Sequence, residues 1–220
     1  MSSPIRDFAR ECPVLIFDLG GVLVDLNLER CLLNFAALGF KDAARLISKT
    51  HQSGIFERFE SGKISGAEFC REVREFAGIR AGDAEIRAAW VSMLGGLRPE
   101  KLKLLKRLKS QGRQKILLLS NVNEFAWDFC LKNYFERGGG SLCDFFDRAF
   151  LSFEMKLLKP DLRIYKNLLK EIGAPAGDCL FIDDSPSNCA AAESLGIRAL
   201  RYEDEGEKDF EKTFLGRLFC

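Results

Sequence analysis

Val14-Leu-Ile-Phe-Asp-Leu-Gly-Gly-Val-Leu-Val-Asp25 opens with an apolar run that ends on a carboxylate and leads into a pair of glycines. A short run of large aliphatic and aromatic residues, bounded by turn signals, is typical of a strand covered on both faces. Such a strand would carry Asp18 to the carboxyl edge of a parallel sheet, where open α/β sheets bind their ligands. An aspartate in this position could equally cap a turn or a following helix, so this stretch alone leaves both interpretations open.

A second apolar run, far along the chain, ends in the same way. Cys179-Leu-Phe-Ile-Asp-Asp-Ser-Pro-Ser-Asn188 places Asp183 and Asp184 at the end of a predicted strand. If the two strands lie side by side, these carboxylates meet Asp18 in a small volume, and they cannot all stay ionised without a cation. Hard carboxylate oxygens with few softer ligands nearby favour Mg²⁺. The sequence therefore predicts a magnesium site at the sheet edge.

Two further polar signals lie between these strands. A third predicted strand ends in a hydroxyl and an amide, at Ser120 and Asn121, and Lys159 precedes a predicted helix. Taken singly, these two signals and Asn188 have plain structural explanations: a turn at Ser120 and Asn121, a solvated charge at Lys159, and a helix cap at Asn188. The order of carboxylate, hydroxyl, ammonium and acidic pair along one chain instead favours a shared functional site.

Taken together, these motifs make the chain resemble the haloacid dehalogenase-like hydrolases. The resemblance covers most of the chain and rests on Phe17-Asp-Leu-Gly-Gly-Val-Leu-Val24, Leu119-Ser-Asn121, Lys159-Pro160 and Phe181-Ile-Asp-Asp-Ser-Pro-Ser-Asn188. Within that family, the chain is similar to small phosphatases that act on phosphorylated sugars, including bacterial enzymes that hydrolyse glucose 1-phosphate. The resemblance implies a Mg²⁺-dependent phosphomonoesterase that forms an aspartyl phosphate on Asp18.

The resemblance also assigns a set of metal ligands. The Asp18 carboxylate, the backbone carbonyl of Gly20 and the Asp184 carboxylate are expected to bind Mg²⁺, with Asp183 binding directly or through water. Metal binding requires only the backbone oxygen of residue 20, so a glycine at this position is compatible with the metal site.

The phosphoryl group would be held by residues from the other two motifs. Ser120 and Lys159 are expected to bind the phosphoryl oxygens, and Lys159 also neutralises the nucleophile. Asn121 offers a backbone amide, and Asn188 would orient the acidic loop or its bound waters. The predicted catalytic residues are Asp18, Ser120, Lys159 and Asp183, and the predicted substrate-binding residues are Ser120, Asn121, Lys159 and Asn188.

One position departs from the family's pattern. Family phosphatases usually carry a second aspartate two residues after the nucleophile, as general acid and base, and this chain has Gly20 there. The missing group could be worth about 10² to 10⁴ in rate, unless the cap or a bound water supplies the proton. The resemblance to sugar phosphatases with a similar Asp-Leu-Gly motif implies a sugar phosphate such as an aldose 1-phosphate as the substrate, and an anomeric leaving group depends less on protonation than a simple alkoxide does.

Two other functions stay open. A 2-haloacid dehalogenase also uses an aspartate nucleophile and lacks the second aspartate, but it needs no metal, so the pair Asp183 and Asp184 argues against it. The other is a low-turnover protein that binds a phosphate ligand, for which Gly20 is the main support.

The order of predicted elements indicates an α/β fold. Strands alternate with helices in the second half of the chain, which implies a doubly wound parallel sheet with right-handed crossovers. From residue 27 to 97 we find helical periodicity and no convincing strand. We expect residues 1–26 and 98–220 to form a Rossmann-like core and residues 27–97 to form a small all-helical cap domain, inserted after the first motif. The predicted helices of this insert are residues 28–38, 42–49, 55–60, 65–77 and 83–94.

Bulk composition argues against several classes of partner. Lys and Arg total 33 and Asp and Glu total 32 in the 220 residues, so no field of one sign attracts nucleic acid or an anionic membrane. No stretch approaches the roughly 20 apolar residues that span a bilayer, and the N-terminal segment lacks the apolar core of a signal peptide. We expect a cytoplasmic monomer or homodimer whose partner is a small phosphorylated substrate, with no binding to nucleic acid or membranes.

Overall fold

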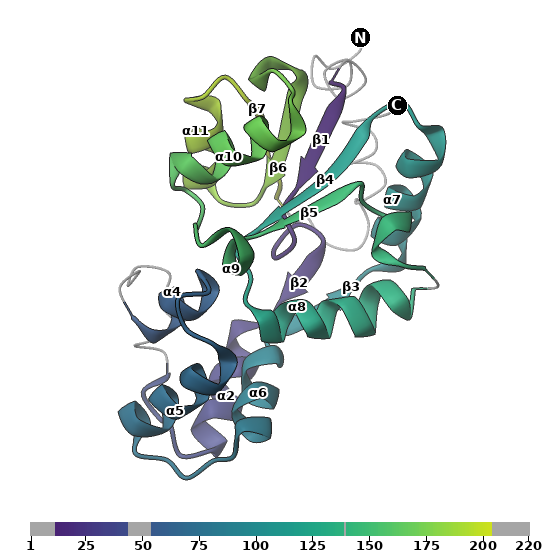
Figure 1. Cartoon of the computed structure of the whole chain (residues 1–220). Coiled ribbons are helices and arrows are strands. Elements are labelled where there is room, and N and C mark those ends of the chain that lie inside the picture. The colour runs from purple at the N-terminus through teal and green to yellow at the C-terminus, as the bar shows by residue number, and fades with distance from the viewer. Residues whose placement is uncertain (1–11, 44–53, 139, 204–220) are drawn as a thin grey trace.

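A five-stranded, entirely parallel sheet forms the centre of the computed structural model, which describes residues 12–43, 54–138 and 140–203. Its strand order is β5-β4-β1-β6-β7, so β1 lies in the middle (Figure 1). The strands are β1 (Val14–Phe17), β4 (Lys115–Ser120), β5 (Arg148–Leu151), β6 (Cys179–Asp183) and β7 (Arg198–Arg201). None of the helices in the described ranges is long and apolar enough to cross a membrane.

Helices cover both faces of this sheet, as the continuous apolar runs predicted. Leu15 and Phe17 point into a core built with α7 (Pro99–Gln111) and α8 (Glu124–Cys130). Val14 and Ile16 belong to a second core on the opposite face, which includes residues of α10 (Leu162–Ile172) and α11 (Pro186–Glu193). Successive side chains of a strand alternate between faces, so a strand buried on both sides needs apolar residues at every position. The predicted doubly wound α/β fold is confirmed.

A third core lies in a group of helices beyond the sheet edge at which β1 ends (Figure 1). These helices are α2 (Leu28–Ala37), α4 (Ile55–Glu60), α5 (Gly66–Ala77) and α6 (Asp83–Val91). Aromatic rings dominate the packing: Phe59 stacks on Phe69 with ring centroids 4.3 Å apart, and Phe56 stacks on Trp90 at 4.8 Å. The predicted helix over residues 42–49 lies mostly outside the described residues. The division into core and cap domains stays a prediction, supported by this separate hydrophobic core.

The expectation of helix alone between residues 27 and 97 is wrong at its C-terminal end. A strand, β3 (Leu94–Leu97), pairs antiparallel with β2 (Val24–Leu26). In the sequence, Gly95 and Gly96 indicate the end of a helix, and a four-residue strand containing two glycines carries no β-branched signal. The structure also adds a short helix, α9 (Ser152–Met155), and continues α8 into a π-helical segment, Leu131–Glu136.

Gly62 lies where the helices of the third core contact the segment that follows β5. It has φ of 62°, and a Cβ built there would lie 2.1 Å from the carbonyl oxygen of Phe153, which follows β5. Gly78 also has a left-handed φ, of 64°, but a Cβ there would meet nothing within 4 Å. A side chain at Gly78 would meet only backbone strain, whereas a side chain at Gly62 would meet the same strain and also a steric clash with Phe153.

Replacing each glycine with alanine tests this contact. Gly78→Ala should cost about 1–2 kcal/mol in the free energy of unfolding, the usual penalty of a left-handed alanine. Gly62→Ala should cost more, because its Cβ also forces the chain at residue 62 away from the Phe153 carbonyl. Urea unfolding of both variants measures the difference, and equal losses would contradict close packing between Gly62 and Phe153.

Candidate active site

Asp18 and Asp183 meet at the carboxyl edge of the sheet because their strands are paired in register. Phe17 of β1 lies opposite Ile182 of β6, which makes the two aspartates neighbours at the strand ends. The backbone N–H of Asp18 donates to the carbonyl of Ile182 at 2.9 Å. Both side chains are almost fully buried, with 7% of Asp18 and 0% of Asp183 exposed. Two adjacent buried carboxylates need a positive charge between them.

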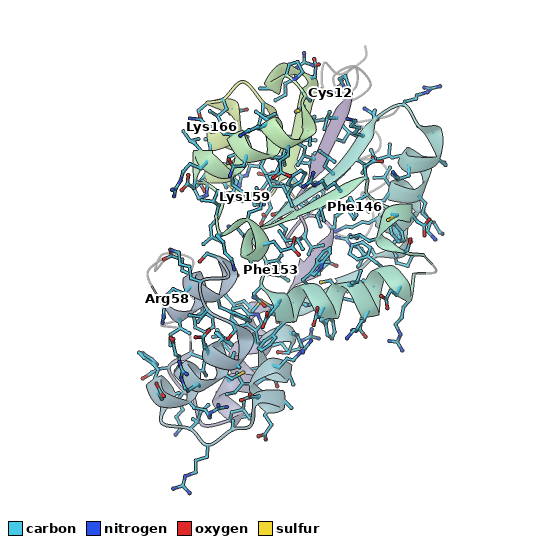
Figure 2. The ribbon with its side chains drawn as sticks, viewed as in Figure 1. Cys12, Arg58, Phe146, Phe153, Lys159 and Lys166 are labelled. Atoms are coloured by element: carbon cyan, nitrogen blue, oxygen red, sulfur yellow. The ribbon has the colours of Figure 1, made fainter. Side chains whose placement is uncertain are left out.

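Lys159 supplies that charge (Figure 2). Its Nζ lies 2.8 Å from Oδ1 of Asp18 and 2.7 Å from Oδ2 of Asp183, and it also donates to the carbonyl oxygen of Leu119 at 3.1 Å. Burial alone would lower the pKa of Lys159, but the charges of the two aspartates and their hydrogen bonds outweigh it and raise that pKa above its ordinary value. Lys159 is therefore a fixed cation that joins three strands, β1, β4 and β6.

Two asparagine side chains hold this arrangement in place. The amide of Asn121 donates to the carbonyl of Lys159 at 2.9 Å and accepts from the Lys159 backbone N–H at 2.8 Å. The amide nitrogen of Asn188 donates to both carboxylate oxygens of Asp183, at 3.0 and 3.1 Å. The sequence predicted the backbone of Asn121 as a ligand, whereas its side chain binds the lysine loop. The role of Asn188 in orienting the acidic loop has a clear geometric basis.

Three carboxylates can hold a cation here. Asp18, Asp183 and Asp184 each offer an oxygen, and these atoms all lie within 4.8 Å of one another. Burial raises the pKa of Asp18 to about 7, and the charge of Asp183 acts in the same direction while Lys159 opposes it. A divalent cation would relieve this cost, and an all-oxygen set suits Mg²⁺. The residues present therefore fit the predicted cofactor, with Gly20 in the turn that follows Asp18.

Ser120 also lies at this edge. It is the last residue of β4, the strand beside β1, and only 1% of it is exposed. Because Phe17 lies opposite Leu118, Ser120 extends beyond the pairing to the level of the residues after Asp18. This position is compatible with its predicted part in binding the phosphoryl group.

One acidic residue near the site was not predicted. Glu60 ends α4, and burial raises the pKa of its carboxyl to about 7, with the negative charge of Asp18 as the second cause. The sequence contained a signal for it: Glu60 follows Phe56 by four residues, so an acid continues the buried face of a short helix. The helix itself was predicted, but nothing in its periodicity links its end to Asp18.

A parallel sheet that gathers an aspartate, a buried lysine and an acidic pair at its carboxyl edge defines a class of α/β hydrolases. The family model described as haloacid dehalogenase-like hydrolase matches residues 12–196. The chain belongs to this family, as its motifs predicted.

Named relatives and solved structures agree with this assignment. The chain is 29% identical to D-ribitol-5-phosphate phosphatase of Bacteroides thetaiotaomicron, over 91% of this chain and 97% of the relative. It is 30% identical to the sesquiterpene phosphatase astK of Aspergillus oryzae, over 86% and 89%. A crystal structure of a HAD family enzyme from Bacteroides thetaiotaomicron, in complex with magnesium and inorganic phosphate, superposes with a TM-score of 0.84 at 36% identity, covering 90% of this chain and 98% of that chain.

Gly21 offers a test of the metal site. It has φ of 78°, and a Cβ there would lie 2.5 Å from Oδ2 of Asp184, so Gly21→Ala should displace that carboxylate. We expect Mg²⁺ affinity to fall about 10–100-fold, the usual effect of disturbing a residue that supports a metal ligand. In the control Gly20→Ala, the added Cβ would lie 3.2 Å from Cδ1 of the half-exposed Leu26 and away from Asp184. Calorimetric titration with Mg²⁺ measures the affinity of both variants. Equal Mg²⁺ affinities for Gly21→Ala and Gly20→Ala would contradict the role of Asp184 as a metal ligand.

The raised pKa of Asp18 predicts how stability depends on pH without metal. The folded value of about 7 lies above the ordinary value of 3.8, so the unfolded chain loses this proton first as pH rises. Its contribution to stability is therefore lost between about pH 4 and pH 7. Asparagine at position 18 does not titrate, so the Asp18→Asn variant does not lose this stability. The melting temperature of the variant minus that of wild type should therefore be larger at about pH 8 than at about pH 5. Melting curves in EDTA measure it, and a difference independent of pH would exclude this titration.

Proposed function

We propose that the chain is a Mg²⁺-dependent phosphomonoesterase for a small phosphorylated polyol or sugar, acting through an aspartyl phosphate on Asp18. The observation that carries the proposal is the position of Lys159 Nζ, within 2.8 Å of Asp18 and 2.7 Å of Asp183. A carboxylate can approach a phosphate dianion only where cations surround it, and the site combines a fixed ammonium with a place for a metal.

The residues of the site account for the first chemical step. An oxygen of Asp18 attacks phosphorus in line, and the bond to the leaving alcohol breaks. Bound Mg²⁺ would neutralise charge on the phosphoryl oxygens and on the nucleophile. Lys159 would also neutralise charge on Asp18, and Ser120 with the backbone of Asn121 would hold the phosphoryl oxygens. Water then attacks the phosphorus of the aspartyl phosphate, which frees Asp18.

Two kinds of substrate fit this proposal. The motif with Gly20 favours an aldose 1-phosphate, whose anomeric oxygen leaves readily. The relative named D-ribitol-5-phosphate phosphatase suggests a polyol phosphate, whose primary alkoxide leaves poorly without a proton. The polyol phosphate therefore needs a general acid to protonate its leaving oxygen, and the aldose 1-phosphate needs it much less.

The other two functions have less support. A dehalogenase has no use for the carboxylate cluster of Asp18, Asp183 and Asp184, whose ligand atoms lie within 4.8 Å of one another. A binding protein would not need a nucleophile held beside a buried lysine. Cytoplasmic location, the monomeric or dimeric state and the absence of nucleic-acid and membrane binding remain predictions.

A panel of phosphate esters with Mg²⁺, with EDTA and with a 2-haloacid in parallel tests the proposed function. We expect hydrolysis of small polyol or sugar phosphates only with Mg²⁺, and no halide release. Asp18→Asn should lose at least about 100-fold in kcat, because an amide cannot form the acyl phosphate. Full activity in EDTA, or turnover by Asp18→Asn near the wild-type rate, would contradict the mechanism. Melting curves of the variant control for its folding.

A further inference from the structure

Glu60 stands at the point where the cap meets the active-site loops. Its neighbours on α4, Ile55, Phe56 and Phe59, are buried in the hydrophobic core of the cap, and Glu60 itself is only partly exposed. The backbone carbonyl of Glu60 lies 2.7 Å from the hydroxyl oxygen of Ser152, at the start of α9 in the core. Figure 1 shows α4 beside α9, below the end of the central strands.

Ser152 connects Glu60 to the loop that carries the phosphate-binding residues. The hydroxyl of Ser152, which is fully buried, accepts from the backbone N–H of Val122 at 2.9 Å and can also donate to its carbonyl at 2.9 Å. Val122 follows Ser120 by two residues. Lys156 of the same core segment donates to the carbonyl of Gly62 at 2.5 Å, two residues after Glu60. Contacts on both sides of Glu60 thus fix the end of α4 against the segment that contains Ser152 and Lys156.

The carboxylate of Glu60 is left without a fixed partner. Among the residues that the structure describes, no side chain or backbone group forms a hydrogen bond or an ion pair with it. By contrast, Glu57 on the same helix faces Lys63 at 3.7 Å, and Arg58 pairs with Glu72. Burial raises the pKa of Glu60, and the negative charge of Asp18 acts in the same direction, so the two carboxyls lie within electrostatic reach of each other. A carboxyl near the nucleophile, with a pKa near neutrality because of burial, can both give and take a proton.

We infer that Glu60 is the general acid and base of the reaction, delivered by the cap in place of the aspartate that Gly20 cannot provide. The inference rests on the proposed function. As Asp18 bonds to phosphorus, the bond from phosphorus to the leaving oxygen breaks, and protonated Glu60 gives its proton to that oxygen, releasing the alcohol. In the second step the Glu60 carboxylate takes a proton from the water that attacks phosphorus. The bond from phosphorus to Asp18 then breaks, and inorganic phosphate leaves with Glu60 protonated again.

A proton donor in the cap widens the range of substrates. With it, the enzyme can expel a primary alkoxide, and the class of polyol and 5-position sugar phosphates becomes accessible. It also ties acid–base chemistry to cap closure, because Glu60 reaches the leaving oxygen only while α4 rests on α9. An ester that binds without closing the cap should react only if its alcohol leaves unaided.

Glu60→Gln tests the role through the leaving group. The variant keeps the size of the side chain and removes its acid, and Glu57→Gln on the same helix is the matched control. For each protein, kcat/KM is measured with Mg²⁺ over esters that range from nitrophenyl phosphate to simple alkyl and polyol phosphates. We expect wild type and Glu57→Gln to show a weak dependence on the acidity of the alcohol. Glu60→Gln should keep kcat/KM for nitrophenyl phosphate within a few-fold and lose about 10² to 10⁴ for alkyl phosphates.

A second readout separates chemistry from structure. In Glu60→Gln the aspartyl phosphate should accumulate, because water loses its base, and a burst of nitrophenol should precede slow turnover. A uniform loss for all esters without a burst, or no loss at all, would overturn the role of Glu60. Those outcomes leave the proposed function intact. The proposed function fails instead if the wild-type protein with Mg²⁺ hydrolyses none of the esters, if it keeps full activity in EDTA, or if Asp18→Asn turns over near the wild-type rate. Glu60→Asp, which keeps an acid, should retain part of the activity on alkyl phosphates if it folds as the Gln variant does.

Discussion

The buried ammonium of Lys159 is the constraint on which the site depends. Two carboxylates at the ends of adjacent parallel strands repel each other, and burial makes their ionisation more costly still. Lys159 lies within 2.8 Å of both and also binds the carbonyl of Leu119, so one side chain joins the ends of β1, β4 and β6. Removing one partner of such a group leaves an uncompensated buried charge. Asn121 and Asn188 are best understood as the supports that keep lysine and aspartate in register.

The fold and most of this site could be predicted from the sequence because local patterns encode them. Uninterrupted apolar runs identified the central strands, and their shared ending on aspartate placed Asp18 and Asp183 at one edge. Full burial alone does not fix the register of β1 and β6, because both strands are apolar on both faces. The observed register, with Phe17 opposite Ile182, agrees with the shared ending of both strands on an aspartate. The antiparallel pair of β2 and β3 was missed because Leu94–Leu97 contains two glycines and pairs with a segment that is distant in sequence.

Glu60 shows what a local pattern cannot supply. Its helix was predicted from periodicity, but its importance comes from the packing of α4 on α9, and Ser152 makes that contact with a residue 92 positions away in sequence. No spacing rule relates Glu60 to Asp18, because the helices around α4 and the sheet have separate hydrophobic cores, and the contact between them depends on their shapes. The sequence showed that an acid was missing at Gly20. Only the three-dimensional arrangement offers a carboxyl in its place.

Chemical trapping of the intermediate tests the central claim most directly. Borohydride reduces an acyl phosphate to the corresponding alcohol, so enzyme quenched during turnover and then reduced should carry homoserine in place of Asp18. Peptide mass spectrometry should find this product only when both Mg²⁺ and a phosphate ester are present, and not in protein without substrate. Modification of a different residue, or unmodified Asp18 in an enzyme whose aspartyl phosphate is made to accumulate, would contradict the role of Asp18 as the nucleophile.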